Sequence, residues 1–96
     1  MYEVQMTTTF RKNIKKCIKR GYDMELLKTA ICLLENSGRL PEEYCPHKLT
    51  GDYVGCWECH LNGDWLLVWK QNDRELILLF TGTGTHSDLF EKGKKH

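Results

Sequence analysis

Three histidines and one carboxylate between residues 47 and 86 could take part in proton transfer: His47, His60, Asp64 and His86. His86 precedes an aromatic ring, Phe90, by four residues, which is about one helical turn. Cleavage of RNA without a metal ion needs a base that takes the proton of a 2'-hydroxyl and an acid that protonates the leaving 5'-oxygen. Imidazoles can serve in either role near neutral pH. These residues therefore indicate an acid–base site for RNA.

The string Thr83–His86, taken with His47 and the run His60–Trp65, resembles the YafQ branch of the RelE-like bacterial toxins. These toxins are endonucleases of messenger RNA. The resemblance runs from about His47 to Phe90 and implies that the four titratable residues form the acid–base set. We expect His86 as the acid and His60, Asp64 or His47 as the base. It also implies that Phe90 stacks against a base of the message. The implied activity is cleavage in the ribosomal A site, which leaves a 2',3'-cyclic phosphate or its hydrolysis product on the upstream fragment.

The same resemblance implies three partners: the ribosome, messenger RNA and a cognate antitoxin of the DinJ or RelB type. An extended or helical segment of the antitoxin would cover the groove of the toxin. The resemblance implies no cofactor. We expect Trp65, Lys48 and Lys70 to contribute to RNA binding.

Position 82 departs from the family pattern. Members usually carry an arginine directly before Thr-Gly-Thr-His, and its guanidinium is thought to stabilise the charged phosphorane, whereas this chain has Gly82. Loss of a charge aimed at a transition state can cost on the order of a hundredfold in rate. Lys48, Lys70 and Arg74 are the cations that could replace it. The sequence thus leaves open a nuclease, weakened or inactivated, and a non-cleaving module that binds antitoxin or ribosome.

The segment Cys56–His60 raises two alternatives that involve cofactors. It matches Cys-x-x-Cys-His, the pattern of covalent haem attachment, but a strand that places Cys56 and Cys59 on opposite faces is a poor attachment site. A zinc site from Cys45, His47, Cys56 and Cys59 is the better alternative. Structural zinc usually takes two tight ligand pairs, and the chain has only one.

Composition limits the remaining classes of protein. The 96 residues suffice for one small domain with one core, so we expect a single toxin domain over residues 1–96. The longest apolar runs are only a few residues, and we expect no membrane span or secretory segment. Five cysteines, an odd number, favour a reducing compartment, so we expect a cytoplasmic protein. The net charge is +1, yet six cations and no acid lie between Arg11 and Arg20, which indicates either a phosphate-binding stripe or a solvated helix face.

The elements that position these residues follow from periodicity and turn signals. We expect a strand over Tyr2–Met6, a helix from Thr8 or Thr9 to Gly21, a helix from Asp23 to about Gly38, strands over 53–61, 65–71 and 75–83, and a short final helix that begins near His86. The fold class is therefore α+β, with an antiparallel meander packed on a helix pair in the order β-α-α-β-β-β-α. This order resembles the RelE-like microbial ribonuclease fold.

Three finer expectations concern the site. The strand that begins at Trp65 is apolar on both faces, so the face away from the helices should carry a groove. A strict Asn62–Gly63 turn would send His60 and Asp64 to opposite faces, whereas a wider turn that includes Asp64 brings both toward one phosphate, and we expect the wider turn. The tail, residues 91–96, is expected to be a frayed end.

Overall fold

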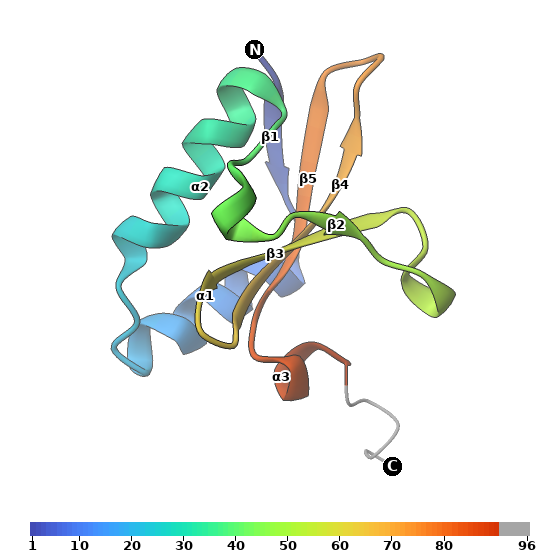
Figure 1. Cartoon of the computed structure of the whole chain (residues 1–96). Coiled ribbons are helices and arrows are strands. Elements are labelled where there is room, and N and C mark those ends of the chain that lie inside the picture. Colours follow the sequence, from blue (N-terminus) through green and yellow to red (C-terminus); the bar gives the residue numbers. More distant parts are fainter. Residues whose placement is uncertain (91–96) are drawn as a thin grey trace.

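A five-stranded sheet in the order β1-β5-β4-β3-β2 forms the centre of the computed structural model, which describes residues 1–90 (Figure 1). The strands are β1 (Glu3–Met6), β2 (His47–Lys48), β3 (Cys56–Asn62), β4 (Trp65–Asn72) and β5 (Ile77–Gly84). β1 runs parallel to β5, and all other neighbours are antiparallel. The expected α+β class, the meander and the place of the first strand are confirmed. The predicted frayed end, residues 91–96, lies outside the described residues.

Capping residues fix the ends of the two long helices. The Thr7 side chain accepts a hydrogen bond from the backbone N–H of Phe10 at the start of α1 (Thr8–Lys19). The Asp23 side chain caps α2 (Met24–Ser37) in the same way. Both helices therefore begin where the sequence predicted, and α2 ends, as predicted, at a glycine in the left-handed conformation.

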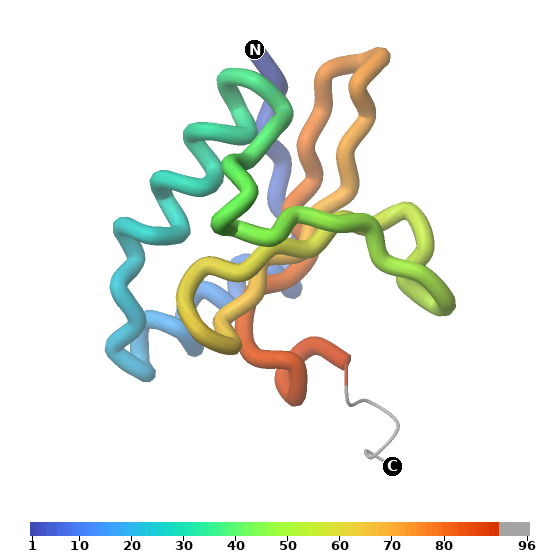
Figure 2. The backbone as a smooth tube through the Cα atoms, viewed as in Figure 1, coloured from blue at the N-terminus to red at the C-terminus, as the bar shows by residue number. Residues whose placement is uncertain are grey.

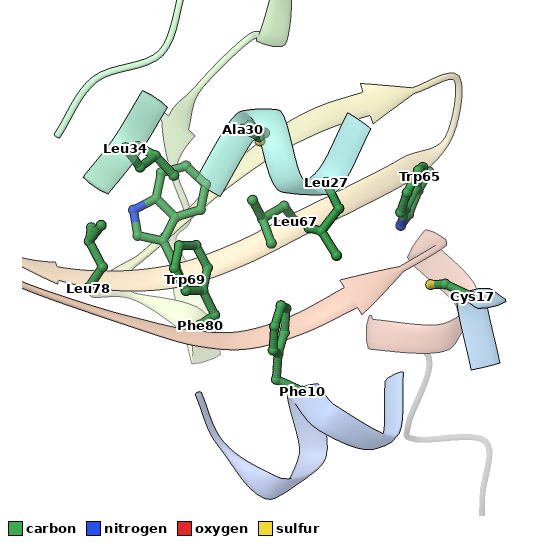
Figure 3. Close-up of a cluster of buried hydrophobic side chains, with 11 residues drawn as sticks. Phe10, Cys17, Leu27, Ala30, Leu34, Trp65, Leu67, Trp69, Leu78 and Phe80 are labelled. Carbon is green, nitrogen blue, oxygen red and sulfur yellow. The ribbon is translucent and has the colours of Figure 1, made fainter. Parts of the chain in front are cut away.

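The helices cover one face of the sheet and enclose the core. Phe10 of α1 and Leu34 of α2 pack against Trp69 of β4 and Phe80 of β5, and all four side chains are buried (Figure 3). The Trp69 ring stacks on Trp57 with centroids 6.1 Å apart. Because alternate strand residues point to opposite faces, the other residues of β3, β4 and β5 form a second face, which we call the open face.

Two irregularities decide which side chains reach the open face. In the β3–β4 hairpin, His60 pairs with Leu66 and Asn62 pairs with Trp65. Leu61 is therefore an extra residue in β3. Gly63 and Asp64 form a two-residue turn, so the turn includes Asp64 as expected, but it is shifted by one residue from Asn62–Gly63 and is not widened. In β5 the extra residue is Thr81, because Val68 pairs with Gly82 and Trp69 pairs with Phe80.

The segment between α2 and β3 was expected to be a long loop. It contains a 3-10 turn η1 (Glu42–Tyr44), strand β2, and a second 3-10 turn η2 (Gly51–Tyr53). The backbone runs along the edge of β3 in this segment, as Figure 2 shows. η2 includes Tyr53, which was predicted to begin the strand over 53–61; that strand, β3, starts instead at Cys56. No helix within residues 1–90 has the length and apolar composition needed to cross a membrane.

Candidate active site

His47, on β2, lies between two hydrogen-bond acceptors. Its Nδ1 is 2.8 Å from the backbone oxygen of Cys45, and its Nε2 is 3.1 Å from Oε1 of Glu58 on β3. The Glu58 side chain is buried, and within residues 1–90 its other oxygen, Oε2, has no hydrogen-bond partner. A nitrogen that faces a carbonyl oxygen is the donor of that contact, so Nδ1 donates to Cys45 and Nε2 faces the Glu58 carboxylate. The two contacts therefore fix the orientation of the His47 ring.

His60 lies beside this pair. The rings of His47 and His60 have centroids 6.5 Å apart, and the Nδ1 atom of His60 is 3.4 Å from the backbone oxygen of Gly63. Glu58 and His60 are two residues apart on β3, so both face the open side of the sheet. Asp64 follows Gly63 in the turn, and its side chain is exposed. Two of the predicted histidines thus meet at one end of β3.

His86 begins α3 (His86–Phe90) and lies against an aromatic pair. Its ring centroid is 5.3 Å from that of Phe90, and the Phe90 ring meets Tyr53 of η2 edge to face, with centroids 4.8 Å apart. Edge-to-face contacts are favourable for aromatic rings. Tyr53 therefore holds the ring that was predicted to stack on a base. Sequence reasoning assigned Tyr53 to a strand and missed this contact.

The strand register relates the two histidine groups. His60 of β3 pairs with Leu66 of β4, and Leu66 pairs with Gly84 of β5. His86 follows Gly84 by two residues. Neighbouring strands are about 4.8 Å apart, so the backbones of His60 and Gly84 are separated by roughly 10 Å. The β3–β4 turn and α3 lie at the same end of the sheet (Figure 1), and the two groups flank the open face there.

Charged contacts attach α3 to α1. Asp88 accepts two hydrogen bonds from the Arg20 guanidinium, at 2.7 and 3.0 Å, and lies 3.4 Å from Nζ of Lys16. Asp88 and Thr85 also cap each other: each side chain accepts a bond from the backbone N–H of the other residue. The Arg20 guanidinium holds the pKa of the Asp88 carboxyl well below its ordinary value. Two cations of the basic stripe are thus engaged within the protein, and phosphate binding by the others stays a prediction.

A cavity of about 420 Å³ lies on the open face, where the apolar middle strand predicted a groove. Val68 of β4 and Gly82 of β5 lie next to each other in its floor, and Lys70 lies on the same side of β4. Asn13 of α1 and the aromatic pair of α3 and η2 form its walls. The cavity is therefore continuous with the residues around His86.

Position 82 has limited space for a side chain. A Cβ atom on Gly82 would lie 3.2 Å from Cδ2 of Leu89 and 3.5 Å from Oδ1 of Asn13. The Leu89 side chain would have to shift by a few tenths of an ångström to accept one. The absence of a side chain at Gly82 thus allows α3 to pack closely on the sheet.

The other residues expected to bind RNA lie in different places. Trp65 is a core residue, 3% exposed, whose Nε1 donates to the Thr83 hydroxyl at 2.8 Å. A buried indole cannot stack on a base, so the position of Trp65 does not fit the RNA-binding role expected from the sequence. Lys48 lies over the ring of Trp57, 5.7 Å from its centroid, which belongs to the face that the helices cover. Only Lys70 lines the cavity on the open face.

The cysteines of the alternative zinc site point in different directions. Cys59 packs in the core, where burial, with a smaller effect of the Glu58 charge, raises the pKa of its thiol to about 12. Cys56 lines the cavity on the open face instead. Residues 1–90 contain no group of three or more His, Cys, Asp or Glu side chains placed to hold a metal ion. Cys56 and Cys59 thus lie on opposite faces of the sheet, as the sequence predicted.

Comparison with known proteins gives a consistent result for sequence and fold. The family model described as "Bacterial toxin of type II toxin-antitoxin system, YafQ" matches residues 2–91. The chain is 36% identical over 89 residues to the mRNA interferase toxin YafQ of Escherichia coli strain K12, which covers 92% of this chain and 95% of that protein.

Solved structures agree with this match. The crystal structure of YafQ from E. coli strain BL21(DE3) is similar with a TM-score of 0.86 and 34% identity, over 94% of this chain and 99% of that one. The crystal structure of the E. coli DinJ–YafQ complex contains a chain with a TM-score of 0.85 and 35% identity, with the same coverage. The similarity thus extends over nearly the whole length of both proteins.

Proposed function

The chain belongs to the YafQ family of bacterial type II toxin–antitoxin toxins, and from this premise we propose that it is an mRNA interferase acting on the ribosome. The observation that carries the proposal is the pair of histidine groups that flank the open face. His47 and His60 lie together on one side, and His86 lies on the other side at the same end of the sheet. Such an arrangement suits a reaction that needs a base and an acid on opposite sides of one phosphate.

His60 is proposed as the base that takes the proton of the 2'-hydroxyl. Its Nδ1 faces the backbone oxygen of Gly63, so the proton of the neutral ring belongs on Nδ1, and Nε2 is the acceptor. His47 is less suited to this step because both of its nitrogens face acceptors. We propose that His47 supports the neighbouring His60 ring from beside it, and that Glu58 positions His47. Asp64, beside His60 in the turn, is the second candidate for the base.

His86 is proposed as the acid that protonates the leaving 5'-oxygen. Attack and departure at phosphorus are roughly in line, so the acid belongs on the side opposite to the base. His86 is exposed and lies against Phe90, which can stack on a neighbouring base of the message. The products would be a 2',3'-cyclic phosphate on the upstream fragment and a free 5'-hydroxyl downstream. In this scheme the side chains alone move the protons, without a metal ion.

The proposed partners are the ribosome, messenger RNA and an antitoxin. E. coli YafQ has been crystallised with DinJ, and the similarity to that chain supports a DinJ-like antitoxin for this protein. The four cations of α1 that make no ion pair within residues 1–90, Arg11, Lys12, Lys15 and Lys19, would face ribosomal RNA. Because the ribosome is the proposed site of action, we place the protein in the cytoplasm.

A second candidate function is a module that binds antitoxin or ribosome without cleavage. The observation that favours it is Gly82, which puts no charge into the cavity on the open face. The two functions differ in one measurable property, the appearance of new 5' ends in a translated message.

The test is cleavage of a message during translation with purified ribosomes. We expect cuts with the wild-type chain, a loss of about a hundredfold with His60→Gln and with His86→Gln, and no cuts without ribosomes. His96→Gln, the remaining histidine, is the matched control and should cleave like the wild type. If neither the wild type nor Gly82→Arg cleaves with ribosomes present, the protein is the binding module. Gly82→Ala separates the steric effect of a side chain from the effect of its charge.

A further inference from the structure

Lys70 is exposed on the open face and lines the cavity beside Gly82. We propose that Lys70 supplies the positive charge that neutralises the scissile phosphate, an inference that rests on the proposed nuclease function. The residue would contact the phosphate directly, in the manner of a point charge on a flexible stem.

The reaction needs such a charge in addition to the histidines. When the 2'-oxygen attacks, the phosphorus becomes pentavalent and its oxygens gain negative charge, which preorganised cations stabilise. His60 acts as a neutral base and His86 gives its proton away. Both nitrogens of His47 already face acceptors, the Cys45 carbonyl oxygen at 2.8 Å and Glu58 Oε1 at 3.1 Å. A further cation is therefore needed near the same phosphate.

The strand register places the Lys70 side chain within reach of the row of residues that contains His47 and Gly82. His47 pairs with Glu58, Glu58 with Val68, and Val68 with Gly82, so these four residues form one row across four strands. Lys70 is the next residue on the same side of β4, about 7 Å further along the strand. A lysine stem can span much of that distance, so its ammonium group can lie above Val68 in the centre of the row.

The surroundings leave Lys70 available. It forms no ion pair within residues 1–90. Two carboxylates also line the cavity: Asp88 is already bound by Arg20, and Asp52 is exposed on η2. Lys70 can therefore move toward an incoming phosphate without breaking an existing contact.

The other candidate cations are placed less favourably. Lys48 lies over Trp57 at the covered face of the sheet. Arg74 lies in the turn between β4 and β5, and hence at the end of the sheet opposite to α3. Arg20 is held by Asp88. Among the cations considered, the geometry points to Lys70.

The experiment is a double-mutant cycle of Lys70→Gln with Gly82→Arg, read as single-turnover cleavage of ribosome-bound message. We expect Lys70→Gln to lower the rate about tenfold to a hundredfold in the Gly82 chain, and only a few-fold when arginine occupies position 82. Lys70→Arg should keep most of the rate because the charge remains. Ribosome binding should change little, since the charge acts mainly in the transition state. Lys28→Gln, which changes an exposed lysine on α2, is the matched control and should stay within about twofold of wild type.

Two results would overturn the proposal. The first is wild-type cleavage by Lys70→Gln, and the second is an equal loss in both backgrounds, which would mean that Lys70 acts on something other than the charge that arginine restores. A melting curve for each variant shows that the fold is retained. If all variants, including Gly82→Arg, fail to cleave, the nuclease function is wrong and the role of Lys70 falls with it. Cleavage that is insensitive to Lys70 removes only the role of Lys70.

Discussion

Arg20 of α1 binds Asp88 of α3 through two hydrogen bonds, although the two residues are 68 positions apart in the sequence. The carboxylate is only 12% exposed and also caps α3 through Thr85. A helix of five residues is not stable by itself in water, so its position depends on such contacts. The Arg20–Asp88 pair therefore fixes the place of His86 and Phe90 relative to the sheet.

Removing the guanidinium should reduce cleavage without unfolding the protein. We expect Arg20→Gln to lower the cleavage rate about tenfold and to speed hydrogen exchange at the Leu89 amide, which bonds to the Thr85 carbonyl. Arg20→Lys should keep part of the rate, because lysine cannot form the two-pronged contact. Lys28→Gln, which removes an exposed cation of α2, is the control. Full activity with fast exchange at Leu89 would show that the position of α3 does not matter for cleavage.

The same ion pair predicts how stability responds to acid. The pKa of Asp88 in the folded protein lies below its ordinary value of about 4 because Arg20 binds the charged form. Its stabilising effect is thus fully present above about pH 4 and is lost as the pH falls further toward the folded pKa. Urea unfolding at pH 7 and pH 3 should show a larger loss for the wild type than for Asp88→Asn. Equal losses would contradict the shifted pKa.

Replacement of Glu58 should have opposite effects on stability and on cleavage. Its Oε2 atom is buried without a partner within residues 1–90, and leaving a buried charged group unsatisfied is costly. We expect Glu58→Gln to raise the free energy of unfolding by about 1 kcal/mol, because the buried charge is removed, and to lower the cleavage rate about tenfold, because His47 loses the carboxylate that positions it. Urea unfolding and single-turnover cleavage measure the two effects. A variant that is less stable and fully active would contradict the pairing.

Variants of Trp65 and Phe90 should separate the effect of the core on stability from the effect of the site on cleavage. Trp65→Phe removes the bond to the Thr83 hydroxyl and part of the contact with Tyr22, whose ring centroid is 4.8 Å away. We expect it to lower the free energy of unfolding by about 1–3 kcal/mol and to leave the activity of the folded protein unchanged. Phe90→Leu should show the reverse, with reduced cleavage and little change in stability. A cleavage defect of folded Trp65→Phe would return that residue to the RNA-binding surface.

Local signals in the sequence predicted much of the fold. Asp23 and Gly38 mark the ends of α2 as expected, and the apolar strand that begins at Trp65 is buried on both sides. The β3–β4 turn was misplaced by one residue. Gly63 occupies its first position, with a φ of 58°, rather than the second. That choice depends on the bulge in the hairpin, which no local signal in the sequence revealed.

The site was predicted in parts. His47 and His60 meet on neighbouring strands, but β2 has only two residues and forms through pairing with β3, which the sequence pattern of the loop does not predict. Glu58 was missed because a glutamate in a strand is usually exposed. Its spacing of two residues from His60 was the available signal. The roles assigned to these residues stay predictions until the variants are measured.

The extra residue Thr81 has a consequence for any insertion or deletion in β5. In a regular strand Phe80 and Gly82 would point the same way, whereas the bulge turns Phe80 toward the helices and position 82 toward the open face. A chain that lost Thr81 would return to regular alternation, with Phe80 still toward the helices and position 82 still toward the open face. A residue inserted between Gly82 and Thr83 would instead exchange the sides of Thr83–His86, although each of these residues was intact.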